Sequence, residues 1–289
     1  MGAGDHRHVG AYGLRLHGMG EGAATLAPAR AAWPALAVQR SPADRPAPER
    51  LMAADRAIVT YRGGAWAALD RVERRAVFRT PTALGDAELL HPYLSAVAAT
   101  FARWDGREAL HGGAVVGAGG AWALLAGRGG GKSTAAAALA VAGRPVVADD
   151  LVVVDGADAC AGPAFVDLRP DAADVLAASG DAGVRAVATA TDVRAGTRRR
   201  VRTPLAPPAV PLRGLVFLAW GDVRRTVRLG PTERLARLAP CRASGREDVH
   251  PDRALALARL PAWLVERPRD AALHETVETL EGLLDGPPA

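Results

Sequence analysis

Residues 126–134 read AGRGGGKST and contain Lys132, the only lysine in a chain of 289 residues. The apolar run AWALLA leads into the glycines, and an alanine-rich run, TAAAALAVAG, follows the lysine. This order predicts a strand, a glycine loop and a helix. Glycines let such a loop turn tightly, so that its backbone N–H groups converge at the positive end of the helix dipole. The stretch therefore predicts a cradle for a chain of phosphates.

The cradle matches the last three places of the P-loop pattern GxxxxGK[ST] with Gly131, Lys132 and Ser133. Ala126 occupies the place of the first glycine, and we expect the adjacent Gly127 to share the turn. A compact ammonium fits between phosphate oxygens where a planar guanidinium is too wide, which accounts for one lysine among 36 basic residues. A glycine-rich turn without a ligand is the alternative, and it leaves Lys132 unexplained. The predicted nucleotide-binding residues are Gly127, Gly129, Gly130, Gly131, Lys132, Ser133 and Thr134.

A pair of carboxylates, Asp149 and Asp150, follows the apolar run at residues 145–148. In ATPases a carboxylate at the end of the strand beside the P-loop organises Mg²⁺. Successive strand residues point to opposite faces, so one carboxylate can address the metal while the other faces the attacking group. The alternative is that the pair only caps the exit of the strand into a loop.

The stretch LHGGAVVGAGGAWALLAGRGGGKST (110–134), followed by VVADDLVVVDG (146–156), resembles the C-terminal catalytic domain of HPr kinase/phosphorylase and its smaller kinase relatives. His111 precedes Lys132 by 21 positions and Asp149 follows it by 17, and this order and spacing carry the resemblance. It covers about residues 109–156 and, more loosely, the strand VPLRGLVFL (210–218).

The resemblance implies an ATP-dependent kinase that transfers the γ-phosphoryl group to a serine-type hydroxyl. It assigns Asp149 as the base, with His111 assisting or orienting it, and Lys132 as the phosphate contact. It also implies that Ser133 and Asp150 hold Mg²⁺, so the expected cofactors are ATP and Mg²⁺. A carboxylate beside a second aspartate and the phosphates of a nucleotide should have a raised affinity for protons, which suits a base.

One part of the family pattern is missing after the aspartate pair. GPAFVDLRPDA (162–172) stands where the bifunctional enzymes carry a longer glycine-rich signature with a metal-binding Glu. The phosphorylase activity and HPr itself as the acceptor are therefore not carried over. A closer likeness is to the HPr-kinase-like enzymes of peptide natural-product pathways, including lasso peptide clusters, which are thought to phosphorylate a precursor peptide. The acceptor is expected to be a hydroxyl of a peptide, a protein or a small molecule.

The expected fold is an α/β, HPr kinase-like P-loop core over residues 106–289, with a smaller N-terminal α+β lobe over residues 1–105. Within the lobe, residues 56–72 predict a hairpin across an Arg-Gly-Gly turn, and residues 86–103 predict a helix with Asp86 as its N-cap. In the core, a strand pair across residues 117–120 precedes the glycine loop, and a further strand covers residues 212–220. Further helices are predicted at residues 171–178, 231–239, 251–260 and 270–284.

Positive charge is concentrated between residues 185 and 246, where 14 arginines face three acidic residues. Such a segment could attract an acidic partner, or it could be a solvated surface, and the sequence leaves both open. Arg169 and the run Arg198, Arg199, Arg200 and Arg202 are candidates for gripping phosphate or an acidic substrate, because a guanidinium can donate two parallel hydrogen bonds. Nucleic acid is disfavoured, since only Phe217 and Trp220 interleave with these charges.

Composition excludes several classes of protein. Cys160 and Cys241 lack CxxC spacing, so neither a disulfide framework nor a zinc site is predicted, and both are expected to be buried. The N-terminus has no apolar segment of a signal peptide, and no uncharged run is long enough to span a bilayer. A cytoplasmic enzyme without a membrane partner is expected, and homo-oligomerisation is left open. The competing function is an ATP-hydrolysing switch or binding module without a phosphoacceptor.

Overall fold

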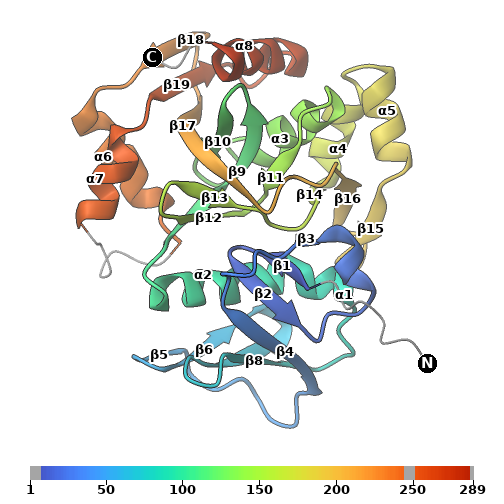
Figure 1. The fold of residues 1–289 in the computed structure, drawn as a ribbon. Helices are drawn as coiled ribbons and strands as arrows, with labels where there is room; N and C mark the ends of the chain where they lie inside the picture. Colours follow the sequence, from blue (N-terminus) through green and yellow to red (C-terminus); the bar gives the residue numbers. More distant parts are fainter. Residues whose placement is uncertain (1–7, 244–250, 287–289) are drawn as a thin grey trace.

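The computed structural model describes residues 8–243 and 251–286 (Figure 1). The N-terminal part of the chain forms an eight-stranded sheet in the order β3-β1-β2-β4-β8-β7-β6-β5. Its strands are β1 (Val9–Ala11), β2 (Leu14–His17), β3 (Ala27–Pro28), β4 (Ala35–Pro42), β5 (Leu51–Met52), β6 (Arg56–Thr60), β7 (Trp66–Asp70) and β8 (Arg75–Thr80). The predicted hairpin is confirmed, because β6 and β7 pair antiparallel around the short 3₁₀ turn η2 (Arg62–Gly64). A second 3₁₀ turn, η1 (Glu21–Thr25), connects β2 to β3.

The helix predicted over residues 86–103 is present but interrupted. It consists of α1 (Asp86–Glu88), the π-helical turn η3 (Leu89–Tyr93) and α2 (Leu94–Trp104). The interruption falls at Pro92, which has no backbone N–H to donate, and at His91, whose backbone is extended. The N-cap is Gly85, so the prediction of Asp86 as cap is wrong. The Asp86 carboxylate instead accepts the Gly22 N–H at 2.7 Å and pairs with Arg40.

Helix α2 lies between the two large sheets of the molecule (Figure 1). Its apolar face includes Leu94, Val97 and Phe101, all fully buried. The hydrophobic cluster around these side chains contains residues of the first sheet, such as Phe78, and of the second, such as Leu151. The two halves of the chain therefore share this hydrophobic cluster. The expected boundary at residue 105 falls between the end of β8 and the start of β9.

The second sheet has the order β10-β9-β12-β13-β17-β19-β18, with β11 added beside β9. Its strands are β9 (Glu108–Gly117), β10 (Gly120–Leu125), β11 (Val146–Ala148), β12 (Leu151–Asp155), β13 (Asp158–Cys160), β17 (Ala209–Trp220), β18 (Arg225–Arg228) and β19 (Ala262–Arg267). Sheets and helices mix as expected for the α/β class, and the strand pair across residues 117–120 is confirmed.

The strands β10, β11, β17 and β19 of this sheet run in the same direction. β10 pairs parallel with β17, and β17 pairs parallel with β19. β11 and β10 are each antiparallel to β9, so β11 shares their direction. The carboxyl ends of all four therefore meet at one edge, which is where open α/β sheets bind ligands. The glycine loop, the aspartate pair, Trp220 and Arg267 all lie at this edge.

Helices flank this edge. The glycine loop leads into α3 (Lys132–Val141), and α3 packs against α8 (Leu273–Asp285) and α4 (Pro170–Ala177). Three predicted helices are confirmed: residues 171–178 correspond to α4, 231–239 to α6 (Pro231–Leu238) and 251–260 to α7 (Pro251–Arg259). The 3₁₀ turn η4 (Ala239–Cys241) follows α6. Helix α8 begins three residues later than predicted.

The basic segment contains structure that the sequence did not predict. After α4 come α5 (Asp181–Ala188) and a hairpin of β15 (Thr191–Val193) and β16 (Arg198–Arg202). β16 also pairs with β14 (Phe165–Leu168), which gives a third, three-stranded sheet. Cys160 and Cys241 are free and buried, as expected. Within residues 8–243 and 251–286, no helix is long and apolar enough to cross a membrane.

Candidate active site

The glycine loop is built from positions that only glycine fits. Gly129 and Gly131 have φ angles of 76° and 82°, in the left-handed region, and Gly131 is the N-cap of α3. A Cβ on Gly130 would stand 2.6 Å from the Cβ of Ala126. The missing side chain of Gly130 therefore makes room for Ala126, which explains how alanine is tolerated where the P-loop pattern has its first glycine.

The carbonyls of the loop are bound by side chains from neighbouring strand ends. Trp220 donates its indole N–H to the Gly129 carbonyl at 2.9 Å, and Arg267 donates Nη2–H to the Gly130 carbonyl at 2.9 Å. The Arg267 guanidinium lies 4.1 Å above the Trp220 ring and is 5% exposed, and this burial lowers its pKa to about 10. The sequence did not identify this brace, because the residues are 90 or more positions from the loop.

Lys132 lies at the start of α3, where the first N–H groups of a helix have no partner within the helix. Its ammonium donates to the carbonyls of Ala126 at 2.9 Å and Gly127 at 3.3 Å. Burial lowers the pKa of Lys132, and the nearby Asp149 carboxylate opposes that shift. The predicted phosphate residues thus surround a helix N-terminus that carries a positive charge.

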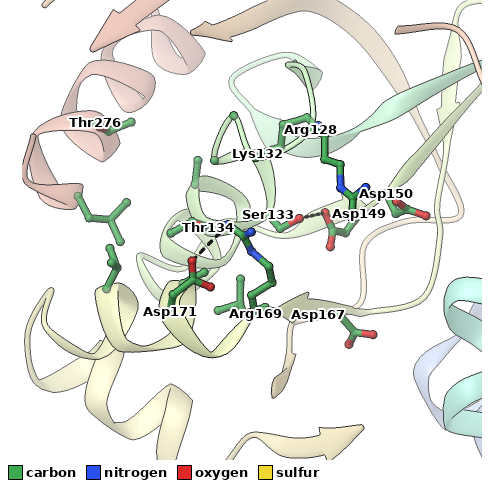
Figure 2. Close-up of a pocket in the computed structure, with 18 of the residues that line it drawn as sticks. Arg128, Lys132, Ser133, Thr134, Asp149, Asp150, Asp167, Arg169, Asp171 and Thr276 are labelled. Carbon is green, nitrogen blue, oxygen red and sulfur yellow. Dashed lines mark hydrogen bonds and ion pairs between the residues drawn. The ribbon is translucent and has the colours of Figure 1, made fainter. Parts of the chain in front are cut away.

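The carboxylate of Asp149 points back to the loop (Figure 2). Ser133 donates its hydroxyl to Asp149 Oδ1 at 3.0 Å, and Asp149 is only 9% exposed. Burial, followed by the adjacent charge of Asp150, raises the pKa of Asp149 to about 7, although the Ser133 hydrogen bond acts in the opposite direction. The raised proton affinity has the direction expected from the sequence.

The carboxylate of Asp150 has different neighbours, because its backbone takes the left-handed conformation with φ of 69°. Ser95 donates its hydroxyl to Asp150 Oδ2 at 3.0 Å, and His91 Nδ1 lies 3.6 Å from the same oxygen. His111 Nδ1 lies 3.5 Å from Oδ1 and 3.1 Å from the backbone carbonyl of Asp150. The Asp150 side chain is 33% exposed, so it is the more accessible of the two carboxylates.

The structure thus brings all the predicted site residues together but pairs them differently from the sequence-based roles. The sequence joined Ser133 with Asp150 as metal ligands and His111 with Asp149 as the catalytic pair. In the structure, Ser133 contacts Asp149, and His111 contacts Asp150. The reason is the left-handed turn at Asp150, which directs its side chain away from the glycine loop.

Two residues of the N-terminal lobe, His91 and Ser95, were missed. They lie on η3 and α2, with no motif around them to mark a site. Burial is the main cause that lowers the pKa of His91 to about 4, so its imidazole is neutral at pH 7.

A cavity of about 560 Å³ contains the site. Asp149 and Asp150 lie on one side of the view and Thr276 of α8 on the other, with Lys132 and Ser133 between them (Figure 2). His111 and Leu273 also line the cavity. This extent is large enough for a nucleotide-sized ligand.

The arginine run predicted to grip an anion divides into different environments. Arg200 is buried and forms two hydrogen bonds of 2.7 Å to Asp167, with its guanidinium 3.6 Å above the Phe165 ring. Arg199 is paired with Asp192. Arg198 lines the cavity, while Arg202 is exposed and does not.

Arginines outside that run also line the cavity. Arg169 lines it and pairs with Asp171 at 3.2 Å (Figure 2). Arg194, which the sequence did not single out, also lines the cavity and lies 3.8 Å from Asp167. The Nε and Nη2 atoms of Arg194 are buried and have no hydrogen-bond partner within residues 8–243 and 251–286.

The donors near the loop suit a hard cation. In the described part of the chain, no group of three or more His, Cys, Asp and Glu side chains is arranged around a metal position. Mg²⁺ needs no such cage, because it is commonly held by one or two carboxylates together with phosphate oxygens and water. The Ser133 hydroxyl and the Asp149 and Asp150 carboxylates are oxygen donors of this kind.

No protein-family model and no curated protein matches this sequence. Among solved structures, the chain is similar to the Hpr(Ser) kinase/phosphatase from Coxiella burnetii, with 10% sequence identity and a TM-score of 0.27. The match covers 61% of this chain and 93% of that one. The likeness is distant.

Proposed function

We propose that the protein is an ATP-dependent phosphotransferase that transfers the γ-phosphoryl group to a serine-type hydroxyl of a peptide, a protein or a small molecule. The observation that carries the proposal is that the two carboxylates of the aspartate pair have different surroundings. One carboxylate, Asp149, is buried against the P-loop serine, and the other, Asp150, is accessible beside His111 in the same cavity. An ATPase needs the first of these, whereas transfer to an acceptor hydroxyl also needs the second.

The nucleotide phosphates would be held by the N-terminus of α3 and by Lys132. The helix dipole and the unpaired N–H groups of the first turn favour anions at this position. Trp220 and Arg267 keep the loop carbonyls occupied, so that the opposite, N–H side of the loop can face the phosphates. The far end of the cavity, at Leu273 and Thr276, is left for the nucleoside.

Ser133 and Asp149 would hold Mg²⁺, directly or through water. Mg²⁺ held by these residues would supply positive charge that offsets the negative charge developing during phosphoryl transfer. This assignment exchanges the roles that the sequence gave to the two aspartates. It is supported by the 3.0 Å contact between Ser133 and Asp149, since the P-loop hydroxyl is a metal ligand in proteins with this motif.

Asp150 would act as the base, with His111 orienting it. The acceptor hydroxyl gives its proton to the Asp150 carboxylate as its oxygen forms a bond to the γ-phosphorus, and the bond between that phosphorus and the β–γ bridging oxygen breaks to release ADP. The contacts of His111 with both the carboxylate and the carbonyl of Asp150 favour an orienting role.

Transfer of label tests this function. The purified full chain is incubated with γ-labelled ATP, Mg²⁺ and an extract of the organism that encodes it, and labelled products are identified by mass spectrometry. Lys132→Arg is the control: it keeps the charge, but the larger guanidinium cannot settle between the β- and γ-oxygens, so transfer should fall by orders of magnitude.

Label on a hydroxyl that depends on Lys132 supports the kinase. Lys132-dependent release of phosphate, with no labelled acceptor at any extract concentration, supports the ATP-hydrolysing switch instead. Near-normal transfer by Lys132→Arg contradicts the phosphate role of Lys132.

A further inference from the structure

We propose that the N-terminal lobe forms part of the active site, with Ser95 of α2 as a positioning residue for the Asp150 carboxylate. This inference rests on the proposed function, because it assigns a task to Ser95 only if Asp150 takes part in transfer.

The contact between Ser95 and Asp150 is a partly buried hydrogen bond. Ser95 is 6% exposed, and its hydroxyl lies 3.0 Å from Asp150 Oδ2 and 2.9 Å from the Pro92 carbonyl. The single hydroxyl proton has two acceptors within reach, and an ionised carboxylate is the stronger of them. Ser95 therefore holds Oδ2, which leaves Oδ1, on the His111 side, as the oxygen that can face an acceptor.

The Asp150 side chain needs such a contact because the strand does not fix its direction. Asp150 lies in the turn between β11 and β12 with a φ of 69°, a left-handed conformation that is uncommon for residues other than glycine. Asp149, one residue earlier, is directed to the glycine loop by Ser133. Ser95 is the corresponding hydroxyl donor for Asp150, supplied from a different part of the chain.

Helix α2 can place Ser95 accurately because the helix is anchored on both sides. Leu94 and Val97, which flank Ser95 in the sequence, are fully buried in the cluster shared by the two sheets. The helix contacts β9, which carries His111, and β12, which begins directly after Asp150. The Ala87 carbonyl at the start of this helical segment also accepts a hydrogen bond of 2.6 Å from Arg200 of β16. A rigid element, rather than a loop, thus presents the hydroxyl.

The test is a double-mutant cycle on ATP turnover by the full chain, measured as phosphate transfer to the identified acceptor or, without one, to water. Ser95→Ala should lower kcat by about tenfold, since a hydrogen bond to a charged group is worth roughly that factor or more, and leave the KM for ATP within about twofold. In an Asp150→Asn background, Ser95→Ala should cause no further loss. Thr100→Ala is the matched control, because Thr100 is buried on the same helix and, among the described residues, its hydroxyl bonds only to the Ala96 carbonyl.

Each result decides between defined conclusions. Unchanged kcat in Ser95→Ala, with turnover that still depends on Lys132 and Asp150, overturns this inference and leaves the proposed function intact. The same conclusion follows if the losses from Ser95→Ala and Asp150→Asn multiply, or if Thr100→Ala loses as much activity as Ser95→Ala. Wild-type protein without any Lys132-dependent turnover overturns the proposed function, and the inference with it.

Discussion

Adjacent aspartates in this protein have opposite surroundings. Asp149 is buried and accepts the Ser133 hydroxyl, whereas Asp150 turns away through a left-handed backbone and meets Ser95, His91 and His111. Two aspartates that are adjacent in the sequence therefore have different surroundings, which supports the different tasks proposed for them.

Paired amide variants should separate these tasks. We expect Asp150→Asn to lower kcat by roughly a hundred- to ten-thousand-fold, the usual contribution of a general base, with Mg²⁺-ATP affinity within a few-fold of wild type. Asp149→Asn should weaken the Mg²⁺ dependence and nucleotide binding as well as turnover. Steady-state kinetics and nucleotide titrations at several Mg²⁺ concentrations measure both. The reverse pattern restores the roles predicted from the sequence, and unchanged phosphoryl transfer in both variants excludes either aspartate as the base.

The pKa of Asp149 also makes stability depend on pH. The folded state keeps the proton on Asp149 up to about pH 7, whereas the unfolded chain releases it near the ordinary carboxyl value, about 4. Between these values rising pH favours the unfolded chain, so wild type loses stability from about pH 4 to 7 through this group.

The Asp149→Asn variant does not titrate there. Without Mg²⁺, its Tm advantage over wild type should therefore be greater at pH 8 than at pH 5, by a few degrees. Calorimetry at the two pH values measures this difference. Asp174→Asn, at an exposed position of α4, is the control and should show the same Tm difference from wild type at both. An equal advantage of Asp149→Asn at both pH values would contradict the raised pKa.

At the scale of elements, the glycine loop depends on the ends of β17 and β19. Trp220 and Arg267 are the last residues of these strands, and each binds a loop carbonyl. The parallel pairing of the two strands places their ends together, so one stacked pair braces the loop.

Removing one donor of this brace should weaken nucleotide binding rather than chemistry. Trp220→Phe keeps an aromatic ring for Arg267 but loses the N–H that binds the Gly129 carbonyl. A hydrogen bond of this kind contributes about 1 kcal/mol, so the Kd for Mg²⁺-ATP should rise about fivefold, with kcat nearly unchanged. Trp66→Phe is the control, since the buried Trp66 N–H has no hydrogen-bond partner in the part of the chain that the structure describes. Equal nucleotide affinity in the two variants would show that the Trp220 N–H does not support nucleotide binding by the loop.

At the scale of the whole molecule, the cluster of positive charge is partly structural. Arg200 neutralises Asp167 in the interior, while Arg198 lines the cavity and is available to an acidic acceptor. Neutralising the run as a unit would mix these two effects.

Single variants should separate them. Arg198→Gln should raise the KM of the identified acceptor, as higher ionic strength should, with less change in the KM for ATP. Arg200→Gln should instead lower the free energy of unfolding by about 3 kcal/mol, because it leaves the Asp167 carboxylate buried without its guanidinium. Denaturant titration and acceptor kinetics measure the two effects. An acceptor KM that responds to neither salt nor Arg198→Gln would show that Arg198 does not contribute to acceptor binding.

Local signals in the sequence determined the α/β class, the order of strand, glycine loop and helix, and most helix positions. They worked because glycine conformation, helix periodicity and the strand before the loop depend on near neighbours. They also selected the glycine loop, Asp149 and Asp150, whereas His111 was selected through the family resemblance, and these residues meet in the cavity.

Only the tertiary structure decided what each of these residues touches. The turn at Asp150 exchanges the partners of the two aspartates, and no local pattern marks a left-handed aspartate. Ser95 and Trp220 reach the site from 55 and 91 residues away in the chain. Such contacts arise from the packing of α2 between two sheets and from the parallel order of β10, β17 and β19. Spacing along the chain does not encode these distances, because they depend on how separate elements pack together.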